Sequence, residues 1–492
     1  MSATAEHASG ASIAALLADR VAKTPDSTAF SFRSGDRWAS LTWAQAEDRV
    51  RAIAAGLIGL GADAETRVAI LSSTRVEWIL ADLAILAAGG ATTTIYPSNT
   101  PDECAFVISD SDTRIVIAEN DAQVDKLRKV RDQIPSVQAV VVLDGRADGD
   151  GDGDWVRTLA DVEAAGAQSP DAEPAAYRAR VAAITGDRLA TLMYTSGTTG
   201  RPKGVELTHD NWVYVAEAAM AVAIIRSDDL HFLWLPMSHS FGKALAVMMI
   251  AAGTPSAIDG SVDRIAANLA ELRPTVVAAA PRVFEKIHNT IVATVRREGG
   301  VKAQLFGWAR GVGLAATKAR QAGKSPSILT QAQLQVADRL VLSKIRGRFG
   351  GRIRYFISGS APLSAEIAEF FDAAGMTILE GYGLTESSAA SFVNRPGAPR
   401  FGTVGPPLPG TEVKIAEDGE VLFRSRGIMR GYHGLPEETA ATLLEGGWLA
   451  TGDIGEVDAE GRLRITDRKK ELIKTSGGKY VAPAPIESQI KA

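Results

Sequence analysis

The chain has 492 residues, of which 53 are basic and 58 acidic, so its formal net charge is −5. Hydrophobic residues make up 46% and charged residues 23%, a balance typical of soluble globular proteins that excludes a disordered, collagen-like or fibrous chain. The single cysteine, Cys104, excludes an internal disulfide framework and a cysteine-based zinc site. The mild acidity, with no basic patch interleaved with aromatic residues, argues against nucleic acid as a partner.

No apolar run reaches the roughly 18 residues that a membrane-spanning helix needs. The first twelve residues are small and polar, with no basic segment before a hydrophobic one, so we expect no signal peptide. No clearly basic amphipathic helix is visible either. These features predict a cytoplasmic protein with at most peripheral contact to a membrane, and they leave its oligomeric state open.

Short β-branched runs alternate with amphipathic stretches through the first 143 residues. The pattern predicts strands at residues 67–72, 91–96, 114–118 and 138–143, and helices at residues 43–60, 75–88, 103–109 and 121–132. Strands that alternate with helices in this way indicate βαβ units, which form a mostly parallel sheet with helices on both faces. The fold class is therefore α/β.

A second alternating region extends from residue 189 to about residue 399. After it, short strands at residues 411–415, 419–423 and 463–466 are separated by glycine turns, which indicates a small β-rich subdomain. The last 25 residues contain one helix start, at residues 485–491, and are too few to bury a core. We therefore predict four units: α/β subdomain A (1–186), α/β subdomain B (187–400), the β-rich subdomain (401–467) and the beginning of another domain (468–492).

The segment richest in chemical information covers residues 192–209, with the sequence LMYTSGTTGRPKGVELTH. An apolar strand leads into a loop of glycine and hydroxyl residues, and backbone N–H groups in such a loop can approach anionic oxygens closely. Lys203 adds a mobile positive charge, so the loop suits the phosphates of a nucleotide. It is not a Walker A loop. Composition alone leaves a solvated loop equally open. The loop residues concerned are Thr195, Ser196, Gly197, Thr198, Thr199 and Gly200.

The string YTSGTTGRPKG resembles the phosphate-binding signature of the adenylate-forming superfamily, which contains acyl-CoA synthetases, adenylation domains and luciferases. Four further segments resemble motifs of that family in the expected order: GSAPL (359–363), GYGLTE (381–386), WLATGD (448–453) and DRKKE (467–471). Residues 475–487, with the sequence TSGGKYVAPAPIE, are similar to bacterial long-chain fatty-acid CoA ligases.

The resemblance implies that the carboxylate of a fatty acid attacks the α-phosphate of ATP to give acyl-AMP, and that the thiol of CoA then displaces AMP. It implies that Tyr382 stacks on adenine, Asp453 binds the ribose and Arg468 supports it. Thr385 would contact phosphate, and Glu386 would hold Mg²⁺, a cation that prefers carboxylate and phosphate oxygens. The remaining nucleotide-site residues that it implies are Gly359, Ser360, Ala361, Glu380, Gly381, Gly383 and Ile465.

Residues 235–242 resemble the segment beside the acyl carboxylate, where His239 would hydrogen-bond the developing acyl phosphate. A buried histidine that closes a loop is the alternative interpretation of His239. Residues 216–225 and 244–252 are apolar and contain methionine, so they can form either an acyl tunnel or ordinary core helices.

The sequence departs from the family in one respect. The family's C-terminal lid continues about a hundred residues past the hinge and carries a catalytic lysine, which is not found among the 492 residues here. We therefore expect the rate of adenylation to be lower by roughly two to three orders of magnitude.

The leading hypothesis is an AMP-forming long-chain fatty-acid–CoA ligase that uses ATP, Mg²⁺ and CoA. Two alternatives stay open: a fatty acyl-AMP ligase that passes the adenylate to a carrier protein, and a non-catalytic nucleotide-binding protein.

Overall fold

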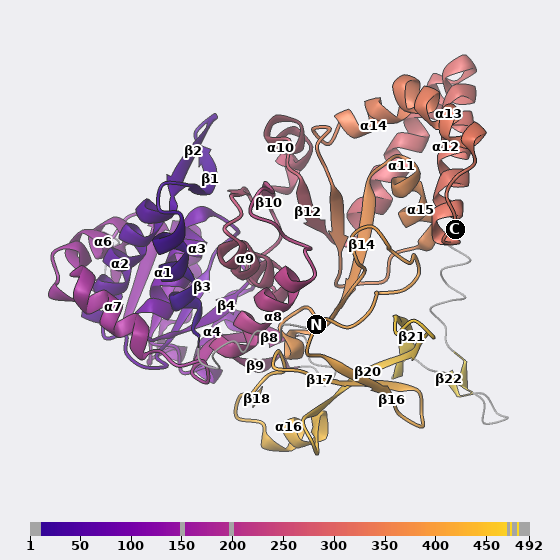
Figure 1. The fold of residues 1–492 in the computed structure, drawn as a ribbon. Helices are drawn as coiled ribbons and strands as arrows, with labels where there is room; N and C mark the ends of the chain where they lie inside the picture. Colours follow the sequence, from indigo (N-terminus) through magenta and orange to yellow (C-terminus); the bar gives the residue numbers. More distant parts are fainter. Residues whose placement is uncertain (1–10, 148–152, 196–200, 470–472, 475–479, 482–492) are drawn as a thin grey trace.

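A computed structural model of the chain describes residues 11–147, 153–195, 201–469, 473–474 and 480–481. Two large sheets, each covered by helices, stand side by side, and a smaller β-rich part lies below them in the view of Figure 1. The α/β class expected from the sequence is confirmed.

The first large sheet has eight strands, in the order β18-β9-β8-β4-β3-β5-β6-β7. Its central strands β3 to β6 pair in parallel and are almost wholly buried, as expected when helices cover both faces. The strands are β3 (Arg67–Leu71), β4 (Ala91–Ile95), β5 (Ile115–Asn120), β6 (Ala139–Asp144), β7 (Val156–Thr158), β8 (Leu189–Thr195), β9 (Lys203–Thr208) and β18 (Gly431–Tyr432).

All eight elements predicted between residues 43 and 143 are present, with ends that shift by a few residues. Three helices of this part begin with capping boxes, in which Thr42, Thr100 and Thr208 accept a backbone N–H three residues later. The helices of this part are α1 (Ile13–Lys23), α2 (Trp43–Gly59), α3 (Val76–Ala87), α4 (Pro101–Asp110), α5 (Asp121–Lys129), α6 (Leu159–Ala167), α7 (Pro174–Ala183) and α8 (His209–Ala221).

The second large sheet also has eight strands, in the order β15-β14-β13-β12-β10-β11-β1-β2. Its strands are β1 (Thr28–Ser34), β2 (Arg37–Thr42), β10 (His231–Leu233), β11 (Ser256–Ile258), β12 (Val276–Ala279), β13 (Tyr355–Ser358), β14 (Thr377–Tyr382) and β15 (Phe392–Val393). Three helices of this part are α9 (Ser240–Ala252), α10 (Ile265–Leu272) and α15 (Ala365–Ala373).

The two large sheets exchange segments of chain. Strands β1 and β2 come from the N-terminal region but complete the second sheet, whereas β8, β9 and β18 come from later in the chain and complete the first. The expected boundary at residue 186 therefore does not separate one sheet from the other. Sequence periodicity identifies strands but not their partners, so this exchange could not be read from the alternation of elements.

The β-rich part contains a five-stranded sheet, as expected for residues 401–467. Its elements are β16 (Glu412–Ile415), β17 (Glu420–Arg424), α16 (Pro436–Thr442), β19 (Leu443–Leu444), β20 (Trp448–Val457) and β21 (Leu463–Arg468). A separate pair, β22 (Ile473–Lys474) and β23 (Tyr480–Val481), follows it. The helix expected at residues 485–491 lies outside the described residues.

A run of helices projects from the second sheet between β12 and β13, at the upper right of Figure 1. It consists of α11 (Pro281–Glu298), α12 (Gly300–Gln321), α13 (Ile328–Ala337), a π-helical turn η4 (Asp338–Leu342) and α14 (Ser343–Gly347). Helix α11 buries Phe284 and Ile291 and exposes four basic side chains, among them Arg296 and Arg297, so it is amphipathic and basic. The expectation that the chain has no such helix is therefore wrong.

No helix in the described part of the chain combines the length and apolar character that are needed to cross a bilayer.

Candidate active site

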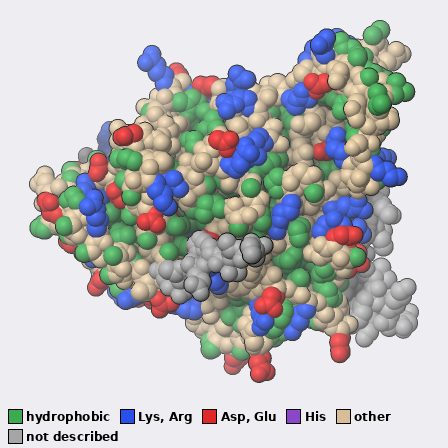
Figure 2. Space-filling model, viewed as in Figure 1, with side chains coloured by type: hydrophobic (Ala, Val, Ile, Leu, Met, Phe, Trp, Pro, Cys, Tyr) green, Lys and Arg blue, Asp and Glu red, His purple; other side chains and the backbone are tan. Residues whose placement is uncertain are grey.

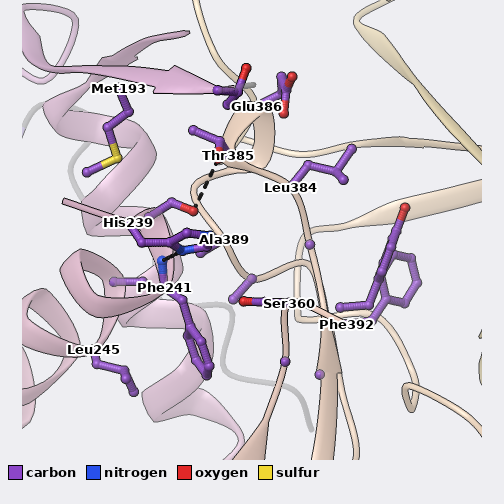
Figure 3. A pocket seen from close by; sticks show the side chains of 18 of the residues that line it. Met193, His239, Phe241, Leu245, Ser360, Leu384, Thr385, Glu386, Ala389 and Phe392 are labelled. Atoms are coloured by element: carbon purple, nitrogen blue, oxygen red, sulfur yellow. Dashed lines mark hydrogen bonds between the residues drawn. The ribbon is translucent and has the colours of Figure 1, made fainter. Parts of the chain in front are cut away.

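A cavity of about 590 Å³ opens where the first sheet, the second sheet and the β-rich part meet. Figure 3 shows its walls, with His239 and Phe241 on one side and Thr385, Glu386 and Ala389 on the other. A volume of this size is in the usual range for small-molecule sites. Eleven of the residues expected at the site line this one cavity: Thr195, Lys203, His239, Gly359, Ser360, Gly381, Tyr382, Gly383, Thr385, Glu386 and Arg468.

The β8–β9 hairpin brings the phosphate-loop motif to the cavity. Strand β8 pairs with β9 in antiparallel fashion, which places Thr195 opposite Lys203 at the open end of the hairpin. The ammonium of Lys203 lies 5.0 Å from the centre of the Tyr432 ring, within range of a cation–π contact. The expected residues Ser196, Gly197, Thr198, Thr199 and Gly200 lie outside the described residues.

The motif around Tyr382 turns sharply after β14. A Cβ atom on Gly383 would lie 2.3 Å from the carbonyl oxygen of Ala389, so only glycine fits there. Ser388 and Ala389 both adopt positive φ angles, of 55° and 72°, which is uncommon for residues with side chains. This tight turn carries Thr385 and Glu386 into the cavity.

Tyr432 is a site residue that the sequence analysis missed. Its hydroxyl donates a 2.7 Å hydrogen bond to Oε1 of Glu386, and its ring faces Lys203. Tyr432 belongs to β18, which joins the first sheet beside β9, so strand pairing positions it. The two hydrogen-bonded residues are 46 positions apart in the chain, and no local pattern pointed to the tyrosine.

Glu386 offers one carboxylate ligand for the magnesium ion that the family resemblance implies. No group of three or more metal-binding side chains is present among the described residues, so the chain offers Mg²⁺ no complete cage there. Magnesium commonly binds one or two carboxylates together with phosphate oxygens and water. Glu386, with Thr385 beside it, matches that donor set if the phosphates come from a bound nucleotide.

Asp453 lies just behind the cavity wall and holds two residues of the wall in place. Its Oδ2 accepts a 2.5 Å hydrogen bond from the Tyr382 hydroxyl, and its Oδ1 lies 2.8 Å from Nε of Arg468. Burial raises the pKa of Asp453, while the hydrogen bond from Tyr382 and the charge of Arg468 oppose that rise. Burial and the Asp453 charge raise the pKa of Tyr382, so this phenol stays a neutral donor.

The segment GSAPL lies at the end of β13 and contributes Gly359 and Ser360 to the cavity. Ser360 has a positive φ of 71°, a strained conformation of the kind that often occurs at functional sites. Ala361 is exposed next to it and does not line the cavity.

Two further expected residues, Glu380 and Ile465, are not among the cavity lining. Glu380 is buried, and its Oε1 accepts the backbone N–H of Gly402 at 3.2 Å. Burial raises the pKa of this carboxyl to about 8, against the hydrogen bond from Gly402. Ile465 is on β21 and packs against the small core of the β-rich part.

His239 both caps a helix and lines the cavity, so the two interpretations of this residue are compatible. Its Nδ1 accepts the backbone N–H of Phe241 at 3.1 Å at the start of α9. Burial lowers the pKa of His239, which favours the neutral ring. With Nδ1 acting as an acceptor, the hydrogen-bond pattern assigns the proton to Nε2.

The far end of the cavity is aliphatic. Helix α9 contributes Ala244, Leu245 and Met248, which recur at helical spacing on one face. Ala219 of α8 and Ile224 complete this apolar wall. Other residues of the same two stretches, such as Ala216 and Val247, are buried in the core. The two apolar stretches therefore serve both as core helices and as one wall of the cavity.

The model of the family described as "AMP-binding enzyme" matches residues 17–433. The chain belongs to this family. It is 36% identical over 482 residues to the long-chain-fatty-acid–CoA ligase FadD15 of Mycobacterium bovis, an alignment that covers 98% of this chain and 78% of that protein.

The fold agrees with this membership of the AMP-binding, or adenylate-forming, family. The anthranilate CoA ligase AuaEII in complex with anthranoyl-AMP is similar in fold, with a TM-score of 0.75 and 22% identity over 100% of this chain and 83% of the other. ATP-bound MatB from Rhodopseudomonas palustris has a TM-score of 0.73 and 25% identity over 98% of this chain and 83% of its own. The resemblance inferred from the five sequence motifs is confirmed.

Proposed function

We propose that this chain activates long-chain fatty acids with ATP and transfers the acyl group to CoA. The observation that carries the proposal is one cavity with a polar wall and an aliphatic wall. Thr195, Lys203, Thr385 and Glu386 lie in the polar wall, and Ala244, Leu245 and Met248 in the aliphatic one. The similarity to long-chain-fatty-acid–CoA ligases supports the same assignment.

In the first step an oxygen of the fatty-acid carboxylate attacks the α-phosphorus of ATP. A P–O bond forms, the bond to the β-phosphate oxygen breaks, and acyl-AMP and pyrophosphate result. Because the substrate supplies the nucleophile, the protein's task is to bring two anions together and to neutralise their charge. Lys203 and the Thr385 hydroxyl would bind phosphate oxygens, and Nε2–H of His239 would donate to the carboxylate.

Tyr382, Asp453 and Arg468 would hold the nucleoside. The ring of Tyr382 would stack on adenine, and Asp453 would accept hydrogen bonds from the ribose hydroxyls. Glu386 would hold Mg²⁺ together with phosphate oxygens, and when bound this ion would neutralise charge on the phosphates. Tyr432 would keep the Glu386 carboxylate in position, since its hydroxyl donates to Oε1.

In the second step the sulfur of CoA attacks the acyl carbon, the C–O bond to AMP breaks, and the thiol proton is released. The named relatives support CoA as the acceptor rather than a carrier protein. Glu386 and Asp453 each accept a hydrogen bond from a tyrosine hydroxyl, which argues against a protein that only binds nucleotide, because such a protein does not need carboxylates held in fixed orientations.

The test uses the purified 492-residue chain with ATP, Mg²⁺ and a series of saturated fatty acids, and measures acyl-AMP by mass spectrometry under single-turnover conditions. CoA is then added, and acyl-CoA is measured. We expect adenylate with long-chain acids, and its conversion to acyl-CoA.

Two outcomes would contradict the proposal. If acyl-AMP accumulates and CoA does not consume it, the chain is an acyl-AMP ligase. If no adenylate forms although ATP binds, and Glu386→Gln binds Mg-ATP as well as the unmodified chain, the protein is a nucleotide-binding protein without this activity. Glu437→Gln, an exposed substitution outside the cavity, is the matched control.

A further inference from the structure

The helices between β12 and β13 carry a charge opposite to that of the rest of the chain. Residues 281–348, which we term the basic lobe, contain thirteen basic and three acidic residues, a formal charge of +10. The remaining sequence has 40 basic and 55 acidic residues, a formal charge of −15. The overall charge of −5 conceals this asymmetry, which is why composition gave no indication of it.

Most of these cations are not neutralised by the protein itself. Four of them, Lys302, Arg310, Arg320 and Arg346, lie within 4.0 Å of a carboxylate. The other nine form no ion pair within the described part of the chain, and all nine are exposed. They are Arg282, Lys286, Arg296, Arg297, Lys318, Lys324, Arg339, Lys344 and Arg348. The positive electrostatic potential of these nine side chains therefore acts on molecules that approach the lobe from outside.

The same lobe exposes large aliphatic side chains. Ile328 is 87% exposed, Val301 79% and Leu329 69%, and Trp308, Val336 and Leu340 are exposed as well. These are six of the ten large hydrophobic residues that are exposed in the described part of the chain. Figure 2 shows hydrophobic side chains gathered at the upper right end of the molecule, over α12 and α13, with basic side chains nearby. Such a concentration marks an interaction surface rather than scattered surface residues.

The pattern along α13 and η4 supports a partner on the outer side. Leu329, Val336 and Leu340 are spaced by seven and four residues, so they lie on one outward face of the continuous helix. Ala337 and Leu342 are buried on the inner side, and Leu334 packs against the core. A helix that is apolar on two sides is normally covered on both.

We propose that the basic lobe binds the surface of an anionic phospholipid bilayer. The lobe exposes aliphatic side chains and also nine cations that form no ion pair within the described part of the chain, and this combination suits a bilayer. The aliphatic side chains can enter the acyl boundary while the cations meet phosphate and carboxylate headgroups. A second copy is a poorer match, since a two-fold interface would bring +10 against +10. Single-stranded nucleic acid would need a platform of aromatic residues, and the exposed large residues here include one aromatic, Trp308.

This inference does not depend on the proposed activity, because it follows from charge and exposure alone. If both hold, the lobe would bring the enzyme to the phase in which long-chain fatty acids dissolve.

Sedimentation with vesicles tests the proposal directly. The purified chain is mixed with vesicles of phosphatidylcholine containing 30% phosphatidylserine, or of phosphatidylcholine alone, at low and at high salt. We expect binding to the anionic vesicles, at least tenfold weaker binding to the neutral ones, and weakening by salt, because screening shortens the reach of the charges. Equal binding to both kinds of vesicle, or no binding to either, would overturn the proposal.

Two variants locate the surface. Ile328→Ser/Leu329→Ser removes aliphatic contacts, and Arg296→Gln/Arg297→Gln removes two unpaired charges. Each lost charge should weaken binding about fivefold. The controls are Ile415→Ser/Leu444→Ser and Lys23→Gln/Lys129→Gln, which change exposed residues elsewhere. All these side chains are exposed, so the melting temperature should be unchanged. Lobe variants that bind like their controls would refute the assignment.

A fluorescent label gives a second, local measurement. Cys104 is the only cysteine and is buried, and burial raises the pKa of its thiol to about 11, so an introduced cysteine can be labelled selectively. A polarity-sensitive dye on Ile328→Cys should shift to the blue with anionic vesicles, whereas the dye on Leu444→Cys should not. A blue shift that appears with protein concentration in the absence of vesicles would instead identify a second copy as the partner and overturn the proposal.

Discussion

The hydroxyl of Tyr382 donates a 2.5 Å hydrogen bond to Oδ2 of Asp453, across 71 positions of the sequence. The bond joins the end of β14 in the second sheet to β20 in the β-rich part. Two residues that the family resemblance assigns to adenine and ribose are thus fixed to each other. The nucleoside end of the proposed site is therefore set by how these two parts of the molecule pack.

Tyr382→Phe should weaken the binding of AMP about fivefold while adenine stacking is retained. The substitution removes one hydrogen bond, worth about 1 kcal/mol, and keeps the ring. Tyr382→Ala should weaken binding further, because the stacking surface is lost as well. Calorimetric titration with AMP measures both. Equal affinities of the phenylalanine and alanine variants would contradict a stacking role for the ring.

Tyr432→Phe should weaken the binding of Mg-ATP by about ten- to hundredfold and leave the binding of AMP unchanged. Hydrogen bonds to charged groups contribute about 1.5–3 kcal/mol, and the one from Tyr432 orients the carboxylate that we assign to Mg²⁺. The same titration with the two nucleotides provides the comparison. Tyr214→Phe, which removes a tyrosine hydroxyl bound to Pro409 and Thr411 outside the cavity, is the control. If both nucleotides lose affinity equally, Tyr432 has only a structural role.

Glu380→Gln should remove a pH dependence of stability. The folded pKa of about 8 lies above the usual value of 4.5, so between these pH values the native state keeps a proton that the unfolded state has lost. Stability therefore falls as the pH rises through this window, by at most about 1.4 kcal/mol per pH unit.

Glutamine can still accept the N–H of Gly402 but does not ionise, so the variant should be the more stable form at pH 8–9. Urea unfolding from pH 5 to 9 tests this, with the exposed Glu437→Gln as control. If the free energy of unfolding changes with pH in the same way in the unmodified chain and in Glu380→Gln, the Glu380 carboxyl has its usual pKa in the folded state and the prediction is wrong.

Gly383→Ala should destabilise the fold by about 1–3 kcal/mol, the usual cost of overpacking. The new Cβ would lie 2.3 Å from the backbone oxygen of Ala389, so the turn that presents Glu386 must move. Gly359→Ala is the matched control in the same cavity, because its nearest neighbour would be Phe241 Cε1 at 3.4 Å. Thermal unfolding of the two variants gives the comparison, and similar losses in both would contradict the steric argument.

The sequence was sufficient for the local elements of the first sheet and for most of the candidate site. Buried parallel strands such as β3 and β5 are continuous apolar runs, and their helices follow a clear period, so both are visible in a short window. Ordered motifs likewise led to Tyr382 and Glu386, which line the cavity, and to Asp453, which is hydrogen-bonded to Tyr382.

The sequence alone did not reveal which distant segments of the chain contact one another. Tyr432 reaches Glu386 only because β18 pairs with β9. Glu380 lies outside the cavity lining, where it accepts the N–H of Gly402, 22 positions later in the chain. The basic lobe was hidden for a different reason: its charge is cancelled in the total by the acidic remainder.

The exchange of strands between the two large sheets bears on how the protein is made. The edge strand of the first sheet, β18, is formed by residues 431–432. The central strand β3 of the same sheet is complete once residue 71 has been synthesised. A growing polypeptide therefore exposes an unpaired edge at β9 until residues 431–432 have been synthesised, and that edge is where we expect a chaperone to act or aggregation to begin.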